Sequence, residues 1–480
     1  MRNLYLCLGL ACLLFLAACG SNSGGVTGFV PQGTFSKSSL KGQYVYQIEG
    51  FDFSTNLNGV AYREAGVFTA DGVGGITSAT DDFSEGNTFL TTNSTGSYNV
   101  SNDGTGSLTL NNALGTIHLA VTLVSASKVY LVEGDSALNG GGLAEKQDLT
   151  AIASTPSGTF VFREHDLNPT QSVATVGAFT VAGGIVSNGN EDVNRGGAFS
   201  SLTFTGSLNA PDSSNGRGTG SFTDNSPATS SFVYYIVDAN NVRFMAATVG
   251  VNGLGRAELQ TGTPALSGSY AFGSEGDTPS FLADANMAGR FTASSATITA
   301  GALDSVVSGV SATNVSFTGT YTQAASGRAL VSLSTAANGN LVVWMVSPAR
   351  GFFLVNDAST VQDGSLDLQQ ISSFSNSTMT GQFALVMDGF DAGGAKDRVG
   401  TLQWDGSGKL VLNEFTNASG VITVPVILSG NYAVSGNGRT AASINNLSNN
   451  LIFYLISGND AYVVQNDAGV TINGTISKQQ

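Results

Sequence analysis

The sequence predicts an all-β protein built from four tandem antiparallel units of about eight strands each. A hairpin-like stretch of alternating apolar and polar residues with a turn occurs four times, and no long stretch has helical periodicity. The chain has 62 glycines, 41% hydrophobic residues and only 11% charged residues, against roughly 25% charged residues in typical soluble domains. The four hairpins occupy residues 95–110, 205–222, 318–333 and 429–444.

Two further features recur with this hairpin and set the length of the repeat. A glycine two residues before an aromatic residue begins each unit, and a glutamine ends it. Successive glutamines are 113, 109 and 110 residues apart, which is longer than the period of solenoid repeats. We therefore expect each copy to be a domain with its own core. The glycines are Gly42, Gly158, Gly268 and Gly381, and the glutamines are Gln147, Gln260, Gln369 and Gln479.

The repeats divide the chain into six segments. Short linkers rich in Ser, Thr and Pro separate neighbouring units, and units joined this closely are expected to touch. The predicted segments are a lipoprotein signal peptide at 1–18, a flexible tether at 19–39, and β units at 40–148, 155–260, 264–370 and 373–480.

Eight strands are predicted in the first unit from short patterned runs between turns. Asp71-Gly72 and Asp103-Gly104 are typical of tight hairpins, because glycine accepts a positive φ without a clash at Cβ. Eight short strands in sequence order predict an up-and-down barrel or a two-sheet sandwich, and a β-propeller is the alternative if each unit splits into two sheets. The strands are Gln43–Ile48, Ala65–Ala70, Gly75–Ala79, Gly96–Val100, Gly106–Leu110, Ile117–Val124, Lys128–Glu133 and Gly142–Gln147.

One strand of units two to four departs from simple alternation. Residues 232–237, 341–346 and 451–456 are apolar on both faces, whereas residues 117–123 of the first unit alternate. A strand that is buried on both faces must be covered from outside its own barrel or sandwich. We therefore expect units two to four to pack against neighbouring units through this strand.

The start of the chain is typical of a signal peptide. Arg2 precedes an apolar run that is too short and too near the terminus to be a dependable membrane span. The run ends in LAAC at Leu16–Cys19, which resembles the lipobox of bacterial lipoproteins. The resemblance implies that Cys19 becomes the acylated N-terminus and that its lipid anchors the protein to a membrane. Because Gly20 rather than an aspartate follows the cysteine, the resemblance implies the outer membrane, on either face.

The whole chain is also similar to uncharacterised tandem β-repeat lipoproteins of the bacterial envelope, a resemblance that implies no activity.

The composition of the mature chain excludes some kinds of site and disfavours one class of partner. Cys7 and Cys12 lie in the predicted signal peptide, so disulfides and thiolate metal sites are excluded from the mature chain. Removal of Arg2 leaves 18 of the 19 basic residues against 34 acidic ones, which makes nucleic acid a poor partner.

Residues that favour catalysis are sparse. The two histidines, His118 and His165, occupy non-equivalent positions in different units. We expect His118 to face solvent or a neighbouring unit, while the charged neighbours of His165 point to opposite faces of a strand. The sequence has no nucleophile elbow, phosphate loop or zinc-type histidine pair. We therefore predict that the protein is not an enzyme and has no catalytic residue, cofactor or metal site.

Charged residues instead recur at matched positions of the units. An arginine follows the turn glycine in units two to four, where the first unit has Thr105, and acids follow the first and third strands. One interpretation is that these acids cap turns or pair with the arginine at a barrel rim, and the other is a polar rim around a ligand mouth. The arginines are Arg217, Arg328 and Arg439, the first acids are Asp52, Asp166, Asp277 and Asp391, and the second acids are Asp82, Asp192, Asp304 and Glu414.

These observations favour a non-catalytic, lipid-anchored protein of the cell envelope whose repeats provide a binding or structural surface, since multiplied weak sites gain avidity. The alternative function is a carrier in which each barrel holds a small apolar ligand. A third interpretation is an enzyme acting on polysaccharide, although no unit shows a distinctive pair of carboxylates. The expected partners are the membrane and an envelope protein, a polysaccharide or a small apolar ligand.

Overall fold

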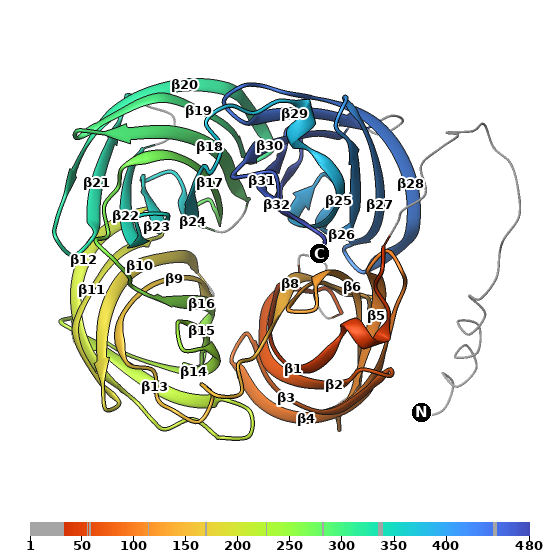
Figure 1. Cartoon of the computed structure of the whole chain (residues 1–480). Helices are drawn as coiled ribbons and strands as arrows, with labels where there is room; N and C mark the ends of the chain where they lie inside the picture. Colours follow the sequence, from red (N-terminus) through yellow and green to blue (C-terminus); the bar gives the residue numbers. More distant parts are fainter. Residues whose placement is uncertain are drawn as a thin grey trace, which may run out of the picture. The chain divides into compact units, whose positions relative to one another are not determined.

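The computed structural model describes residues 33–480 except 55, 57–58, 114, 169, 227, 281–282, 335–338 and 445–448. The predicted signal peptide and Cys19 lie outside the described residues. The described chain forms four closed β-barrels of eight strands each (Figure 1). The first and last strands of every barrel pair in antiparallel register and close it. The prediction of four antiparallel β units is confirmed in its up-and-down barrel form, and the sandwich and propeller alternatives are wrong.

The first two barrels follow one another along the chain with the same strand order. Barrel 1 consists of β1 (Lys41–Asp52), β2 (Val60–Asp71), β3 (Gly75–Glu85), β4 (Thr88–Val100), β5 (Thr105–Asn111), β6 (Thr116–Ser125), β7 (Lys128–Glu133) and β8 (Leu138–Lys146). Barrel 2 consists of β9 (Gly158–Asn168), β10 (Gln171–Ala182), β11 (Ile185–Arg195), β12 (Ala198–Leu208), β13 (Arg217–Asp224), β14 (Thr229–Asp238), β15 (Asn241–Ala246) and β16 (Asn252–Leu259).

The last two barrels repeat this plan, with 3-10 turns η1 (Lys37–Ser39) before barrel 1 and η2 (Asn376–Thr378) before barrel 4. In the described part of the chain, no helix has the length and apolar character needed to cross a membrane. Barrel 3 consists of β17 (Gly268–Asp277), β18 (Ala285–Ser294), β19 (Thr297–Val307), β20 (Val310–Gln323), β21 (Arg328–Leu333), β22 (Asn340–Ser347), β23 (Arg350–Asn356) and β24 (Val361–Leu368). Barrel 4 consists of β25 (Thr380–Asp391), β26 (Gly394–Asp405), β27 (Lys409–Ala418), β28 (Val421–Val434), β29 (Arg439–Ile444), β30 (Asn449–Leu455), β31 (Asp460–Gln465) and β32 (Thr471–Lys478).

The first strand of each barrel shows how alternation separates the inside of a barrel from its outside. In β1, Tyr44, Tyr46 and Ile48 belong to the core cluster of barrel 1. The residues between them point out of the barrel, because successive side chains of a strand alternate between its faces. One of these outward residues, Val45, packs against barrel 2. The outer face of this strand is therefore an interface and not a solvent-exposed surface.

The barrel interiors are filled by apolar side chains, and each barrel has its own core cluster. In barrel 2, the rings of Phe162, Phe179, Phe204 and Phe222 have centroids 4.7 to 6.4 Å apart. The cavity among the described aromatic residues of this barrel measures about 20 Å³, which is room for about one water molecule. An acyl chain does not fit there, so the carrier hypothesis has no basis in barrel 2.

The four barrels pack head to tail in a closed cycle, with late strands of one barrel covering early strands of another. Strands β14 and β15 cover β1 and β2, β22 to β24 cover β9 and β10, and β30 and β31 cover β17 to β19. The strands predicted to be buried on both faces lie in these three interfaces, which confirms that prediction. Barrel 1 also takes part, because β6 to β8 pack on β25 to β27 of barrel 4.

The glutamine that ends each unit docks on the next barrel. Gln147 donates from Nε2 to the carbonyl oxygens of Asn215 at 3.0 Å and Ile236 at 2.6 Å, both in barrel 2. The other three glutamines make the same pair of hydrogen bonds. These are Gln260 with Ser326 and Met345, Gln369 with Asn437 and Leu455, and Gln479 with Asp103 and Leu123.

This docking explains why the hairpin is repeated. The turn glycine Gly216 has φ 71°, and a Cβ there would lie 2.9 Å from Nε2 of Gln147. Gly104 in barrel 1 has φ 85°, and its Cβ would lie 2.5 Å from Nε2 of Gln479. Both the backbone conformation and the approach of the amide therefore require glycine. Because Gln479 follows barrel 4 and docks on barrel 1, this contact joins the last barrel to the first and closes the cycle.

We expect Gln479→Ala to loosen the interface between barrels 4 and 1. The variant loses two hydrogen bonds to buried carbonyl groups, worth roughly 1 to 2 kcal/mol together. Hydrogen exchange of β5, β6, β25 and β26 should accelerate, while the other three interfaces keep their protection. Gln480→Ala is the matched control and should leave all four interfaces unchanged; equal exchange in both variants would contradict the docking role of Gln479.

Candidate functional site

The arginines that recur after the turn glycine cross from one barrel to the preceding one. Arg328 of barrel 3 donates from Nε and Nη2 to Asp192 of barrel 2 at 2.7 and 2.5 Å. Trp344 donates to the same buried carboxylate from Nε1 at 2.8 Å. We call such an arginine-aspartate pair a brace. The other two braces join Arg217 to Asp82, with Tyr235 as the further donor, and Arg439 to Asp304, with Tyr454 as the further donor.

The interface between barrels 4 and 1 is held differently. Thr105 stands where the other units have the arginine. Glu414, which stands where they have the aspartate, lies 4.0 Å from Arg398 of its own barrel. Asn417 of barrel 4 instead donates to the carbonyl oxygen of Glu133 in barrel 1 at 2.8 Å. In the described part of the chain, three interfaces therefore have a brace and the fourth does not.

The acids that follow the first strands do not form one set. Asp52 and Asp391 cap turns, accepting hydrogen bonds from the backbone of Ser54 at 2.6 Å and Gly393 at 2.7 Å. Burial raises the pKa of Asp166 to about 6, and its Oδ1 has no hydrogen-bond partner among the described residues. The fourth acid, Asp277, belongs to a buried network between barrels 2 and 3. The arginines and these four acids therefore do not form one rim: the arginines belong to braces, Asp52 and Asp391 cap turns, Asp277 belongs to the network, and Asp166 belongs to none of these groups.

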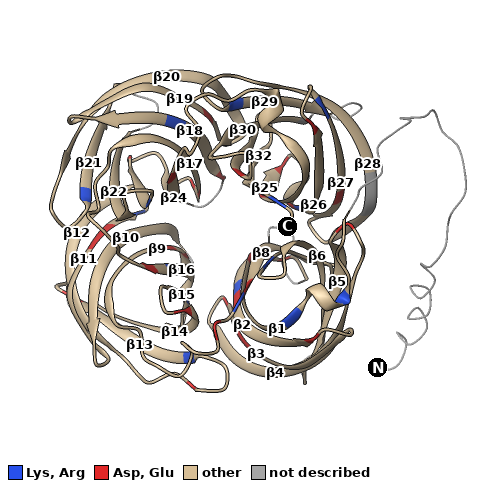
Figure 2. Cartoon of the chain, in the orientation of Figure 1, with Lys and Arg blue, Asp and Glu red and all other residues tan. Residues whose placement is uncertain are grey.

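A different set of ionisable residues meets at the centre of the cycle. Counting seven residues from the glycine that begins each unit reaches Glu49 on β1, His165 on β9, Glu275 on β17 and Asp388 on β25. These residues line a cavity of about 420 Å³ to which all four barrels contribute. Charged residues of both signs occur on strands of all four barrels (Figure 2). Of this set only His165 stands out in the sequence by residue type, and the equivalence of the four positions becomes visible only when register is counted from the glycine that begins each unit.

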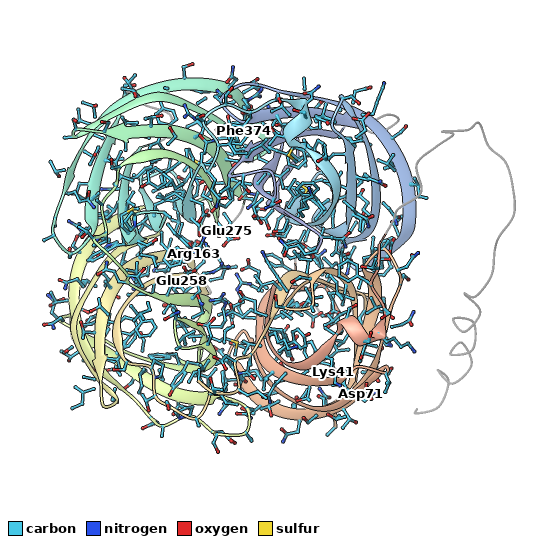
Figure 3. The ribbon with its side chains drawn as sticks, in the orientation of Figure 1. Lys41, Asp71, Arg163, Glu258, Glu275 and Phe374 are labelled. Atoms are coloured by element: carbon cyan, nitrogen blue, oxygen red, sulfur yellow. The ribbon has the colours of Figure 1, made fainter. Side chains whose placement is uncertain are left out.

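His165 is the centre of a network that joins barrels 2 and 3. Its Nδ1 lies 2.8 Å from Asp363, and its Nε2 lies 3.0 Å from Asp277. Burial alone would lower the pKa of His165, but the hydrogen bonds to Asp277 and Asp363 outweigh burial and raise that pKa well above its ordinary value. Arg163 donates to Asp363 at 2.6 Å. It also donates at 2.7 Å to Glu275, which is labelled beside it in Figure 3. The imidazole is therefore held as a cation between two carboxylates.

The same network contains a serine next to the histidine, so that a serine, a histidine and an aspartate are in contact as they are in a nucleophilic triad. Ser172 Oγ lies 2.9 Å from His165 Nε2, and it also donates to Asp277 at 2.9 Å. A general base must be neutral to accept the proton of a nucleophile, and Ser172 is fully buried. The network therefore works as a structural link between barrels. His118, by contrast, is exposed over half of its side chain and pairs with Asp135 at 2.5 Å.

Four arginines lie in the central cavity or its walls, and three of them form close ion pairs with carboxylates of the described chain. Arg163 pairs with Glu275 and Asp363, Arg243 with Glu145, and Arg350 with Glu258 and Asp367. Arg256 is the cross-strand neighbour of both Arg163 and Arg243, and it lines the cavity. Its positive charge contributes to lowering the pKa of Glu145, Glu258 and Glu275, although no ion pair closer than 4.0 Å joins it to a described carboxylate. Burial, and then the neighbouring guanidinium groups, lower the pKa of Arg256 to about 10.

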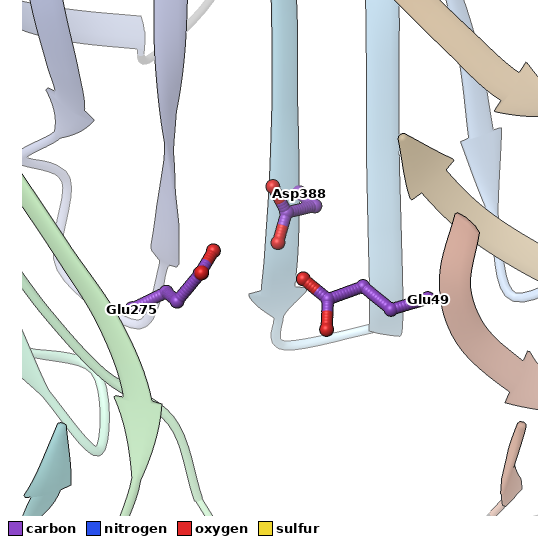
Figure 4. A group of neighbouring side chains, drawn as sticks. All are labelled: Glu49, Glu275 and Asp388. Atoms are coloured by element: carbon purple, nitrogen blue, oxygen red, sulfur yellow. The ribbon is translucent and has the colours of Figure 1, made fainter. Parts of the chain in front are cut away.

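Three carboxylates from three barrels meet at another part of the cavity. One oxygen each of Glu49, Glu275 and Asp388 lies within 4.8 Å of the other two (Figure 4). Burial raises the pKa of Asp388 well above its ordinary value, and the charges of Glu49 and Glu275 add to this effect. Burial would also raise the pKa of Glu275, but Arg163 outweighs burial and lowers it. Carboxylates in this arrangement offer the oxygen ligands of a hard metal cation.

The comparisons with known proteins identify no family. No protein-family model matches the chain, and no curated protein matches it. One similar solved structure is a double mutant of the vaccine antigen transferrin binding protein B from Haemophilus parasuis, which is 12% identical. The match covers 75% of this chain and 86% of that chain with a TM-score of 0.18. A superposition at this level transfers neither a site nor an activity.

We expect Arg328→Met to destabilise the protein by about 3 kcal/mol, because it leaves the buried carboxylate of Asp192 without its counter-charge. Urea unfolding of the purified chain measures the effect. Arg195→Met is the matched control, since Arg195 is exposed and makes no brace. The control should change stability by less than about 0.5 kcal/mol. Unchanged stability in Arg328→Met would mean that this arginine serves a ligand rather than the interface.

The His165 network predicts a loss of stability at alkaline pH. Because the folded-state pKa is raised, the contribution of the imidazolium is fully present below the unfolded value of about 6.5 and falls as pH rises through the folded value. The groups facing the imidazole are Asp277, Asp363 and Ser172. The difference in free energy of unfolding between the wild type and His165→Gln should therefore shrink with rising pH. A difference that stays constant with pH would refute this assignment.

Proposed function

We propose that the protein is a non-catalytic lipoprotein of the bacterial cell envelope that binds a small anionic ligand at the centre of its four barrels. The observation that carries the proposal is the position of Arg256, a guanidinium group that lines the central cavity and forms no close ion pair with a carboxylate of the described chain. A cation removed from water costs free energy unless an anion pairs with it. A ligand carboxylate or phosphate would supply that anion, since a guanidinium binds both in bidentate geometry.

The size and position of the cavity suit a small molecule. Its volume of about 420 Å³ is within the range of roughly 300 to 1,000 Å³ that is usual for ligand sites. All four barrels line it, so a ligand there would depend on the closed cycle. The carboxylates around Arg163, Arg243 and Arg350 already neutralise those three arginines. The anion is therefore expected at Arg256 rather than at its neighbours.

A binding comparison of two arginine variants tests the anion site. Titration of the detergent-purified full chain with inorganic phosphate and with succinate should give saturable binding to the wild type. Arg256→Gln should weaken that binding at least about tenfold, a loss of roughly 1.4 kcal/mol, because it removes the charge that the anion pairs with. Arg195→Gln, which removes an exposed arginine of the same barrel, should bind as the wild type does. Equal binding by both variants would contradict the proposal.

The lipid anchor has its own test, which uses the cysteines of the signal peptide as controls. Cys19→Ser should abolish incorporation of labelled palmitate and move the chain out of the membrane fraction, because it removes the residue that is acylated. Cys7→Ser should still be labelled, since Cys7 lies within the predicted signal peptide. Labelling of Cys19→Ser would refute the lipobox assignment. Outer-membrane location is tested by separating the two membranes of cells that express the wild type.

A further inference from the structure

We propose that the acidic part of the central cavity binds a divalent cation of the Ca²⁺ type through Glu49, Glu275 and Asp388. This site goes beyond the anion site at Arg256 and uses different residues. The three carboxylate oxygens lie within 4.8 Å of one another. Oxygens that surround one Ca²⁺ ion at 2.3 to 2.6 Å are separated by at most about 5 Å, so the three fit around a single ion.

A fourth carboxyl group lines the same side pocket and has one oxygen without a hydrogen-bond partner among the described residues. Asp397 of β26 is only 3% exposed, and its Oδ2 has no hydrogen-bond partner in the described part of the chain. It lines a side pocket of about 70 Å³ together with Glu49, Glu275 and Asp388. An unsatisfied buried carboxylate oxygen costs free energy. A cation in the pocket would satisfy it.

Some carboxyl groups around this pocket have a cationic partner and others have none among the described residues. Arg63 pairs with Glu49 at 3.3 Å, Arg163 pairs with Glu275, and His165 pairs with Asp277. These pairs leave three carboxylates that no described cationic side chain contacts. The three are Asp284, Asp388 and Asp397, all of which line the pocket. One divalent ion would supply the cation that these three carboxyl groups lack.

The ligand types select a hard cation. Every candidate ligand is a carboxylate oxygen, and His165 is engaged by Asp277 and Asp363 on its two nitrogens. Carboxylates without thiolate or imidazole ligands suit calcium, magnesium or manganese rather than zinc or copper. Calcium tolerates irregular geometry, whereas magnesium demands a near-ideal octahedron. Three carboxylates carried by separate barrels are expected to be irregular, so we assign calcium.

The cation would strengthen the cycle where it lacks a brace. Glu49 belongs to barrel 1, Glu275 to barrel 3 and Asp388 to barrel 4. A shared ion would therefore connect barrels 4 and 1, whose interface has neither the arginine nor the aspartate of the other three. Ca²⁺ should accordingly raise the thermal stability of the protein, and the increase should grow with the logarithm of the Ca²⁺ concentration above the dissociation constant.

Calcium titration of the EDTA-treated, detergent-purified full chain tests the proposal. Calorimetry should show one site per chain, and the melting temperature should rise with Ca²⁺. Asp388→Asn should weaken Ca²⁺ binding at least about tenfold while melting, in EDTA, at or above the temperature of the wild type, because it relieves repulsion among the carboxylates. That second measurement separates loss of a ligand from failure to fold.

Asp460→Asn is the matched control, because Asp460 lines the larger cavity on barrel 4 but not the side pocket. It should bind Ca²⁺ as the wild type does. The proposal is overturned if Ca²⁺ at up to about 10 mM produces neither heat nor a shift in melting, since extracellular calcium modules bind near 10⁻³ M or tighter. It is also overturned if Asp388→Asn binds Ca²⁺ normally, or if Mg²⁺ stabilises the wild type more than Ca²⁺ does. Phosphate binding at Arg256 is measured separately, so either site can fail alone.

Discussion

The packing of late strands on early strands is the contact on which the rest of the molecule depends. It is a heterologous contact, because each barrel uses one surface to cover its predecessor and another to be covered by its successor. Such a contact either propagates into an open array or closes on itself. Here it closes after four barrels, with the closing strands of barrel 1 on barrel 4. The apolar outer faces of β14, β22 and β30 follow from this geometry, since those strands serve two cores.

Closure also determines where the charged groups go. The outer face of each first strand carries a small apolar residue, such as Val45 in β1, and an ionisable residue four positions later, such as Glu49. When the apolar positions pack between barrels, the ionisable positions of all four barrels are brought into one cavity. Charges buried in this way are tolerated only when they are paired. His165 and Arg163 show the paired outcome, each in contact with two carboxylates.

Much of the fold could be predicted from local patterns. The recurring glycines and glutamines mark the repeat, the two-residue alternation marks the strands, and a strand that is apolar on both faces signals a neighbour outside the barrel. Each of these patterns can be recognised from residues that are close together in the sequence. These local signals do not distinguish a barrel from a sandwich or a propeller. All three architectures use the same strands and turns and differ only in which strands pair at the edges.

The sequence by itself determined the repeat, its strands, the glycine turns and the residues that needed partners. Only the tertiary structure decided which side chains become the partners of those residues. Arg328 and Asp192 are 136 residues apart, and no local pattern relates two side chains whose meeting depends on how separate barrels pack. The same holds for Glu49, Glu275 and Asp388, which come together because a cycle of four barrels returns to its beginning. The sequence specifies the chemistry of each side chain, but which side chains meet across an interface depends on how the four barrels pack into a closed cycle.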